Sequence, residues 1–228
     1  TLREESIKPE NQWEIAEKRT GTIHLKTPAI QVTVDSPFDY SKQTQVIIVN
    51  DVKRNDLDQV AAAYRDLFIA ANGGSLGLFT AIRRLRAVHG KIFHPLDKLD
   101  LKVYSQHSDG LNLSTLIDIF RMEENSCLLG TDAARDGVDI PGRSLRLIVF
   151  DRVPWPRPAI LNKARQELFG RKIYTDMLTK IKLTQAFGRL IRSKTDKGIF
   201  ILLDPGMPTR LLTASVSYTH LTLPTNRE

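Results

Sequence analysis

The feature that most constrains the fold is an alternation of short apolar runs with longer amphipathic segments. The runs are rich in Leu, Ile and Val, as expected of buried β-strands. The expected strands are 76–79, 102–105, 127–129, 145–150 and 198–203, and the expected helices are 57–71, 81–89, 113–122 and 159–169. Strands that alternate with helices form βα units. The chain is therefore expected to have an α/β fold, with a mostly parallel sheet and helices on both faces.

The segment 185–192, Gln-Ala-Phe-Gly-Arg-Leu-Ile-Arg, carries two patterns that are expected of one helix. At about 100° per residue, Gln185, Arg189 and Arg192 lie within roughly 60° of one another. Phe187 and the other apolar residues gather on the opposite side, with the spacing of a core-facing stripe. The helix is expected to bury that side and to present an amide and two guanidinium groups on the other. A solvated polar face is the alternative interpretation.

Four segments of the chain occur in an order that is found in a known family. The pattern Gln-x-x-Gly-Arg-x-x-Arg of 185–192 resembles motif VI of superfamily 2 helicases, in the form typical of the DinG/XPD-like branch. Segments 130–142 and 75–80 resemble motifs V and IV, and 36–40 is similar to the segment that opens the second motor domain of DinG-like proteins. One such motif would be weak evidence, whereas four in the right order and spacing are specific.

The resemblance implies a division of the chain into three parts. Residues 36–212 resemble the second RecA-like domain of a P-loop NTPase helicase. Residues 1–35 are interpreted as a remnant of the junction that follows the first motor domain. Residues 213–228 match nothing in the family and show an irregular, Thr-rich pattern. They are interpreted as a non-native tail without a predicted element.

The resemblance also assigns residues to an ATP site. In helicases of this kind, ATP binds between two RecA-like domains, and the second domain supplies arginines that neutralise the γ-phosphate. By motif matching, Arg192 is the arginine finger and Arg189 is its phosphate-contacting neighbour. Gln185 would hydrogen-bond the nucleotide, Gly137 and Gly142 would permit tight turns around Asp139, and Asp139 would couple the nucleic-acid contact to the nucleotide.

Four further residues are assigned to nucleic-acid binding. Thr131 and Asp132 follow a predicted strand, and open α/β sheets place ligands at the carboxyl ends of their strands. The resemblance brings Thr131 against the nucleic-acid backbone, although a simple helix N-cap would also explain both residues. Thr80 is expected to cap the helix at 81–89 and, with Arg83, to face the same backbone. For Arg83 a solvated charged face is an equally good explanation.

Positive charge is concentrated in one part of the chain. The formal net charge is +7, and residues 141–210 hold 15 Lys and Arg against 5 Asp and Glu. A basic segment of this kind favours contact with a polyanion, either nucleic acid or a nucleotide. A basic surface without a ligand is the alternative on composition alone.

Several site types are absent from the sequence. No Gly-x-x-x-x-Gly-Lys-[Ser/Thr] phosphate loop occurs, so the resemblance implies that ATP and Mg²⁺ are held mainly by a first motor domain outside this chain. No metal site is predicted. The single cysteine, Cys127, excludes an iron–sulfur cluster within the segment, because such clusters need about four thiolates. Any cluster would lie outside the segment.

The sequence thus predicts a fragment of an ATP-dependent DNA helicase that acts on single-stranded or forked DNA, and the resemblance implies 5′→3′ movement. A non-catalytic nucleic-acid-binding or interaction module with a RecA-like fold is one alternative, and an RNA helicase is another. No apolar run approaches the roughly 20 residues that span a bilayer, and Cys127 is expected to be a buried thiol, so a cytoplasmic location is expected. The sequence makes no prediction of the oligomeric state.

Overall fold

A computed structural model describes residues 12–32, 34, 37–137, 139–140, 142–211 and 218–221. Ser36 of the predicted opening segment and two residues of the motif V-like segment, Val138 and Pro141, lie outside the described residues. The chain divides into two compact units between Pro37 and Phe38, two residues from the predicted boundary at 35/36. The first unit contains α1 (Gln12–Thr20) and the 3-10 turn η2 (Thr22–His24). Its interpretation as a junction remnant stays a prediction.

The second unit is built on a sheet of seven strands in the order β3-β4-β2-β5-β6-β1-β7. Every pair of neighbouring strands is parallel, which confirms the predicted α/β architecture. The strands are β1 (Thr44–Val49), β2 (Ser75–Leu78), β3 (Val103–Ser105), β4 (Cys127–Gly130), β5 (Leu147–Phe150), β6 (Gly198–Leu202) and β7 (Tyr218–Leu221). Of these, β1 and β7 were not predicted.

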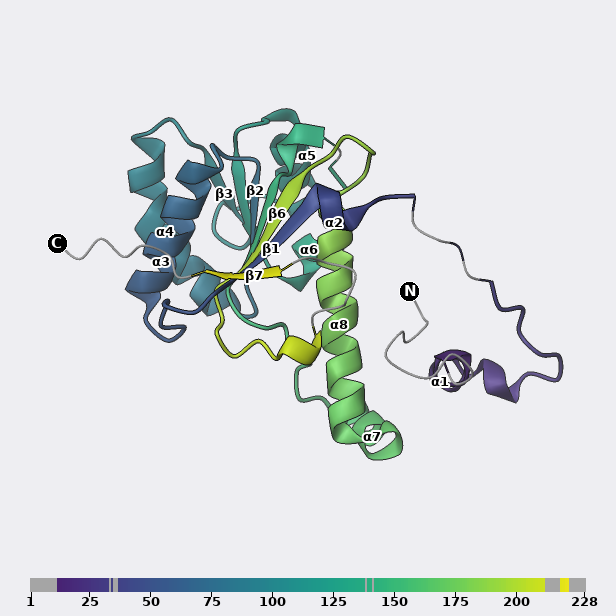
Figure 1. Cartoon of the computed structure of the whole chain (residues 1–228). Coiled ribbons are helices and arrows are strands. Elements are labelled where there is room, and N and C mark those ends of the chain that lie inside the picture. The colour runs from purple at the N-terminus through teal and green to yellow at the C-terminus, as the bar shows by residue number, and fades with distance from the viewer. Residues whose placement is uncertain are drawn as a thin grey trace. The chain divides into compact units, whose positions relative to one another are not determined.

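Helices cover both faces of the sheet (Figure 1), with α3 and α4 on one side and α5, α6 and α8 on the other. The helices are α2 (Tyr40–Gln43), α3 (Leu57–Ala70), α4 (Ile82–Asp97), α5 (Leu113–Met122), α6 (Asp132–Gly137), α7 (Ile160–Phe169) and α8 (Arg171–Leu190). Short 3-10 turns lie at η3 (Gly142–Ser144) and η4 (Thr209–Leu211). Each face has its own apolar core, one centred on Tyr64 and Phe68 of α3 and the other on Phe120 and Leu190. Cys127 of β4 is buried, as predicted, in the core that contains Tyr64 and Phe68.

Helix α3 is capped by Asp56 at its start and stopped at its end by residues with a positive φ. The Asp56 carboxylate accepts hydrogen bonds from the backbone N–H groups of Asp58 and Gln59, at 3.0 and 3.2 Å. These contacts satisfy two amide groups that have no partner inside the first turn of a helix. The helix then stops where Asn72 and Gly73 take positive φ values of 51° and 79°.

The predicted start of α4 is wrong by one residue. Ala81, rather than Thr80, occupies the N-cap position, and it makes no side-chain capping bond. The helix also runs beyond the predicted end at residue 89 and includes Pro95. It continues because Ile92 and Leu96 extend the buried stripe that begins at Leu85.

The largest departure from the sequence prediction lies at the end of α8. The helix ends at Leu190, and Ile191 is extended (φ −118°, ψ 111°), so Arg192 stands on a loop rather than on the helix. The Asp196 carboxylate accepts from the backbone N–H groups of Arg192 and Ser193, both at 2.8 Å. This turn supplies the hydrogen bonds that a further helical turn would have made.

The same turn is fastened to the start of the domain. Gln43, the last residue of α2, donates from Nε2 to the carbonyl oxygens of Ser193 and Asp196, both at 3.0 Å. Figure 1 shows α2 beside the end of α8. The turn that carries Arg192 is therefore held by its own carboxylate and by a residue about 150 positions earlier in the chain.

The predicted tail contains one element. Strand β7 (Tyr218–Leu221) pairs in parallel with β1, which would otherwise be the edge of the sheet. The expectation that 213–228 holds no element is therefore wrong at these four residues. The remaining residues of 213–228 lie outside the described part of the chain, and their non-native origin stays a prediction.

Candidate nucleotide and nucleic-acid interface

Most of the predicted site residues lie near the two ends of α6. Thr131 and Asp132 lie where β4 ends and α6 begins, at the carboxyl edge of the sheet. Gly137 ends the helix, and Asp139 follows it. A helix of this length rises by about 9 Å, at 1.5 Å per residue. The short helix therefore connects the predicted nucleic-acid residues with the predicted nucleotide residues.

At the C-terminal end of α6, two arginines contact the motif V-like segment. Arg192 Nη2 lies 3.0 Å from Asp139 Oδ1 in an ion pair, and Arg189 Nη2 donates to the backbone carbonyl of Asp136 at 2.8 Å. The pKa of the Arg189 guanidinium is lowered, first by its partial burial and then by the nearby charge of Arg192. The structure thus places both predicted catalytic residues and Asp139 in one cluster, which we call the arginine cluster (Arg189, Arg192, Asp136 and Asp139).

The other two predicted nucleotide residues are less closely tied to this cluster. Gln185 lies on the exposed side of α8, one turn before Arg189, and the described part of the chain shows no contact between Gln185 and the cluster. Gly137 does not adopt the positive φ that a tight glycine turn would need. Gly142, the other glycine predicted to turn around Asp139, does have a positive φ, at 77°.

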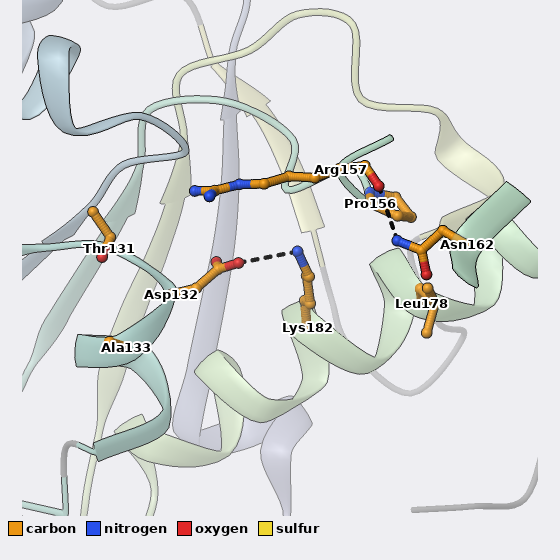
Figure 2. Close-up of a pocket in the computed structure, with 8 residues that line it drawn as sticks. All are labelled: Thr131, Asp132, Ala133, Pro156, Arg157, Asn162, Leu178 and Lys182. Carbon is orange, nitrogen blue, oxygen red and sulfur yellow. Dashed lines mark hydrogen bonds and ion pairs between the residues drawn. The ribbon is translucent and has the colours of Figure 1, made fainter. Parts of the chain in front are cut away.

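A pocket of about 420 Å³ lies at the N-terminal end of α6. It is enclosed by the start of α6, the loop after β5, α7 and α8 (Figure 2). Its lining residues are Thr131, Asp132, Ala133, Pro156, Arg157, Asn162, Leu178 and Lys182. Figure 2 shows the Arg157 side chain running across the pocket above Lys182. We call this space the cationic pocket, because Arg157 and Lys182 supply its positive charge.

Asp132 organises the cationic pocket through two ion pairs. Its Oδ2 lies 3.1 Å from Lys182 Nζ, and its Oδ1 lies 3.0 Å from Arg135 Nη1. Arg135 is buried and also pairs with Asp136 at 2.9 Å. Both carboxylate oxygens of Asp132 are therefore paired with cations of the protein, and one of these pairs holds Lys182 at the pocket.

Thr131 is held by a side chain that the sequence analysis did not select. Its backbone N–H and its hydroxyl both donate to Gln106 Oε1, at 2.9 and 3.1 Å. Both residues are about 8% exposed. The Thr131 side chain therefore has one fixed orientation at the edge of the pocket.

In the motif IV-like segment, Thr80 rather than Arg83 contacts a residue of the pocket. The Thr80 carbonyl accepts a hydrogen bond from Arg157 Nη2 at 3.2 Å, so it helps to place the guanidinium. Arg83 is exposed on α4. The next residue, Arg84, is structural, because it forms a bidentate ion pair with Asp151 at 2.6 and 2.7 Å.

Arg157, Lys182 and Gln106 were missed by sequence reasoning. Arg157 and Lys182 belong to the basic segment 141–210, so its charge was a usable signal for them. Gln106 follows a predicted strand, as Thr131 does. Its place at the carboxyl end of that strand was the only sign in the sequence that it belongs to the site. Asp204, by contrast, acts as strand-end structure: its carboxylate accepts from the backbone N–H groups of Val153 and Gly206, at 3.1 and 3.0 Å.

The described residues hold neither a metal-binding group of side chains nor a membrane-spanning helix. No group of three or more His, Cys, Asp and Glu side chains in the described ranges is arranged to hold a metal ion. Within the same ranges, no helix has the length and apolar character needed to cross a membrane.

Known proteins resemble this chain over most of its length. A model of the helicase C-terminal domain matches residues 64–218. The chain is 32% identical over 195 residues to the ATP-dependent helicase DinG of Mycobacterium tuberculosis, which covers 80% of this chain and 29% of that relative. It is 29% identical over 187 residues to the ATP-dependent DNA helicase YoaA of Escherichia coli, with 77% of this chain and 29% of the relative covered. The chain thus spans less than a third of the length of these relatives.

A solved structure supports the fold. An XPD helicase superimposes on 78% of this chain and 35% of its own length, with a TM-score of 0.60 and 18% sequence identity. At this identity the likeness concerns the fold alone. It shows that the seven-stranded unit shares a RecA-like α/β fold with that structure.

Proposed function

The chain belongs to the helicase C-terminal domain family, and we propose that it is the second motor domain of an ATP-dependent DNA helicase. In this proposal it contributes one wall of the ATP site and part of the nucleic-acid track, and a first motor domain supplies the phosphate loop. DNA is the proposed substrate because the relative YoaA is named a DNA helicase. Single-stranded or forked DNA and 5′→3′ movement are the finer parts of the proposal.

The observation that carries the proposal is the arginine cluster. Two guanidinium groups stand at the end of α8, and they contact Asp136 in the last turn of α6 and Asp139 just after it. A guanidinium is always charged and offers a planar fork that matches phosphate oxygens. Arg192 is partly exposed, with 33% of its side chain accessible, so it can exchange its carboxylate partner for a phosphate.

We assign the roles within the cluster from this geometry. Arg192 is the residue that neutralises charge on the γ-phosphate, and Asp139 holds it while no phosphate is bound. Arg189, fixed on the helix and bonded to the Asp136 carbonyl, is the neighbouring phosphate contact. Gln185 lies one turn earlier and would reach the rest of the nucleotide. These interactions stabilise charge as it develops, which is how an arginine finger accelerates phosphoryl transfer.

The cationic pocket is the proposed contact with the nucleic-acid backbone. Lys182 and Arg157 supply positive charge, Thr131 lines the pocket, and the Thr80 carbonyl holds the Arg157 guanidinium. Asp132 contributes by placing Lys182, and Arg83 contributes charge from the exposed side of α4. Because α6 joins the pocket to the arginine cluster, movement of a phosphate at one end can shift contacts at the other.

ATP with Mg²⁺ is the proposed nucleotide, and its metal is assigned to the first motor domain, where carboxylates of the phosphate-loop domain hold it in this class of enzyme. An iron–sulfur cluster, if the protein has one, also belongs outside this chain, since Cys127 is the single cysteine. We retain the cytoplasm as the expected compartment.

The test is ATP turnover by the full-length protein that carries this chain, with and without single-stranded DNA. We expect DNA to stimulate phosphate release strongly and RNA of the same length to stimulate it weakly. The chain of 228 residues without a first motor domain should release no phosphate above a heat-inactivated control. Equal stimulation by RNA would favour the RNA helicase instead. DNA binding without any turnover in the full-length protein would favour a non-catalytic module.

A further inference from the structure

Gln106 is a buried polar residue at the edge of the cationic pocket to which neither the motifs nor the comparisons give a role. It is the first residue after β3, and its backbone N–H donates to the Leu129 carbonyl of β4 at 2.9 Å. This bond extends the β3–β4 pairing by one residue. The side chain is thereby brought beside Thr131, where β4 ends.

The orientation of the Gln106 amide is fixed by chemistry. One atom of the amide accepts from both the backbone N–H and the hydroxyl of Thr131, at 2.9 and 3.1 Å. A backbone N–H can only donate, so the atom that faces it must be the amide oxygen, Oε1. The Nε2 group therefore points away from Thr131.

This arrangement leaves Thr131 without a donor for a ligand. Its hydroxyl proton is directed to Gln106, and its remaining lone pairs can only accept. A phosphate oxygen needs a donor. Within the described part of the chain, Nε2 of Gln106 has no hydrogen-bond partner and is not among the buried unpartnered atoms, so it reaches the surface.

We propose that Gln106 is a direct contact to the nucleic-acid backbone. Its Oε1 fixes Thr131, and its Nε2 donates to a phosphate oxygen in place of the threonine hydroxyl. The inference rests on the proposed function, because it concerns how the same site holds its DNA. It assigns the donor at this position to a residue outside the motif V-like segment.

The deciding variant is Gln106→Glu. Glutamate keeps an acceptor toward Thr131 and has the same shape, but it replaces the outward donor with a second, negatively charged oxygen. A matched control is Asn112→Asp, the same amide-to-carboxylate change at the exposed N-cap of α5. Aspartate can still accept the Thr115 N–H that Asn112 Oδ1 accepts at 2.8 Å.

The assay is fluorescence anisotropy of a labelled oligothymidylate with the full chain, together with the melting temperature of each variant. We expect Gln106→Glu to weaken DNA binding about tenfold or more and to melt within about 2 °C of the unsubstituted chain. Asn112→Asp should change the affinity less than twofold.

The outcomes separate the two proposals. If the unsubstituted chain binds DNA and folded Gln106→Glu binds equally well, Gln106 only positions Thr131 and this inference is wrong. If the unsubstituted chain binds no DNA even at low salt, the nucleic-acid function itself is overturned. If Gln106→Glu does not fold, Gln106→Met decides, because it lacks the donor without adding charge. A loss of less than twofold for that folded variant would also overturn the inference.

Discussion

Replacing Arg192 by alanine should abolish ATP turnover without destabilising the protein. Its ion pair with Asp139 is exposed, with 33% and 69% of the two side chains accessible, and exposed pairs are worth about 0–1 kcal/mol. For a domain of 150–250 residues, 1 kcal/mol corresponds to roughly 2–4 °C in melting temperature. The loss of an arginine finger, in contrast, costs on the order of 10³–10⁵ in rate.

The measurement compares DNA-stimulated turnover, ATP affinity and melting temperature in the full-length protein. We expect kcat to fall by about 10³ or more, while ATP and DNA affinities change little, because the finger acts mainly in the transition state. Arg189→Ala should show a milder loss with some loss of ATP affinity. Asp139→Asn, which removes the resting partner of Arg192, should leave kcat within a few-fold.

Phe187→Ala is the structural control for this prediction. Its ring is only partly buried and contacts the rings of Tyr40 and Phe200, at centroid distances of 5.6 and 6.0 Å. Truncation of a fully buried Phe costs about 3–5 kcal/mol, so about 2–3 kcal/mol is expected here. If Arg192→Ala turned over ATP normally, or if it lowered the melting temperature as much as Phe187→Ala, the finger assignment would be refuted.

Three further predictions concern stability and binding. Arg84→Met should cost about 3–5 kcal/mol in urea unfolding, because it leaves the fully buried Asp151 carboxylate without its bidentate partner; a cost below 1 kcal/mol would contradict this. Lys182→Ala should reduce the salt slope of single-stranded DNA binding by about 0.7, one phosphate contact, and an unchanged slope would remove Lys182 from the track. Burial lowers the pKa of His89 in the folded state, so the unfolded chain binds the proton more tightly. Stability should therefore fall as the pH drops below about 6.5, and His89→Asn should flatten this dependence in urea titrations at several pH values.

Most of the fold could be predicted because the elements are long enough to show their period. The helix over 113–122 was predicted with the observed bounds, and the parallel sheet followed from the alternation of βα units. Strand β1 was missed although Thr44–Val49 is apolar, and α6 was recognised only by its cap. Six residues are too few for a helical period to distinguish α6 from a loop.

The site was predicted in part, and the errors have a common physical cause. Motif matching selected residues that the structure brings together, such as Arg189 and Asp139. It did not reveal contacts between residues far apart in the chain, such as Gln106 to Thr131 or Asp132 to Lys182. The helix was also extended through Arg192, because helical spacing does not show that Asp196 competes for its backbone amide. Long-range partners and local side-chain competition are not encoded in the spacing of one segment.

The turn that carries Arg192 has a mechanical consequence. The backbone of Arg192 is bonded to Asp196, and the Asp196 carbonyl is bonded to Gln43, at the point where the chain enters the domain. A pull on the chain at α2 therefore reaches the arginine through two successive hydrogen bonds, without passing through the sheet. Arg189 lies on α8 itself, which α2 contacts through the rings of Tyr40 and Phe187. The domain entrance is thus coupled to Arg192 by hydrogen bonds and to the helix of Arg189 by aromatic packing, so a displacement there acts on the two guanidinium groups through different contacts.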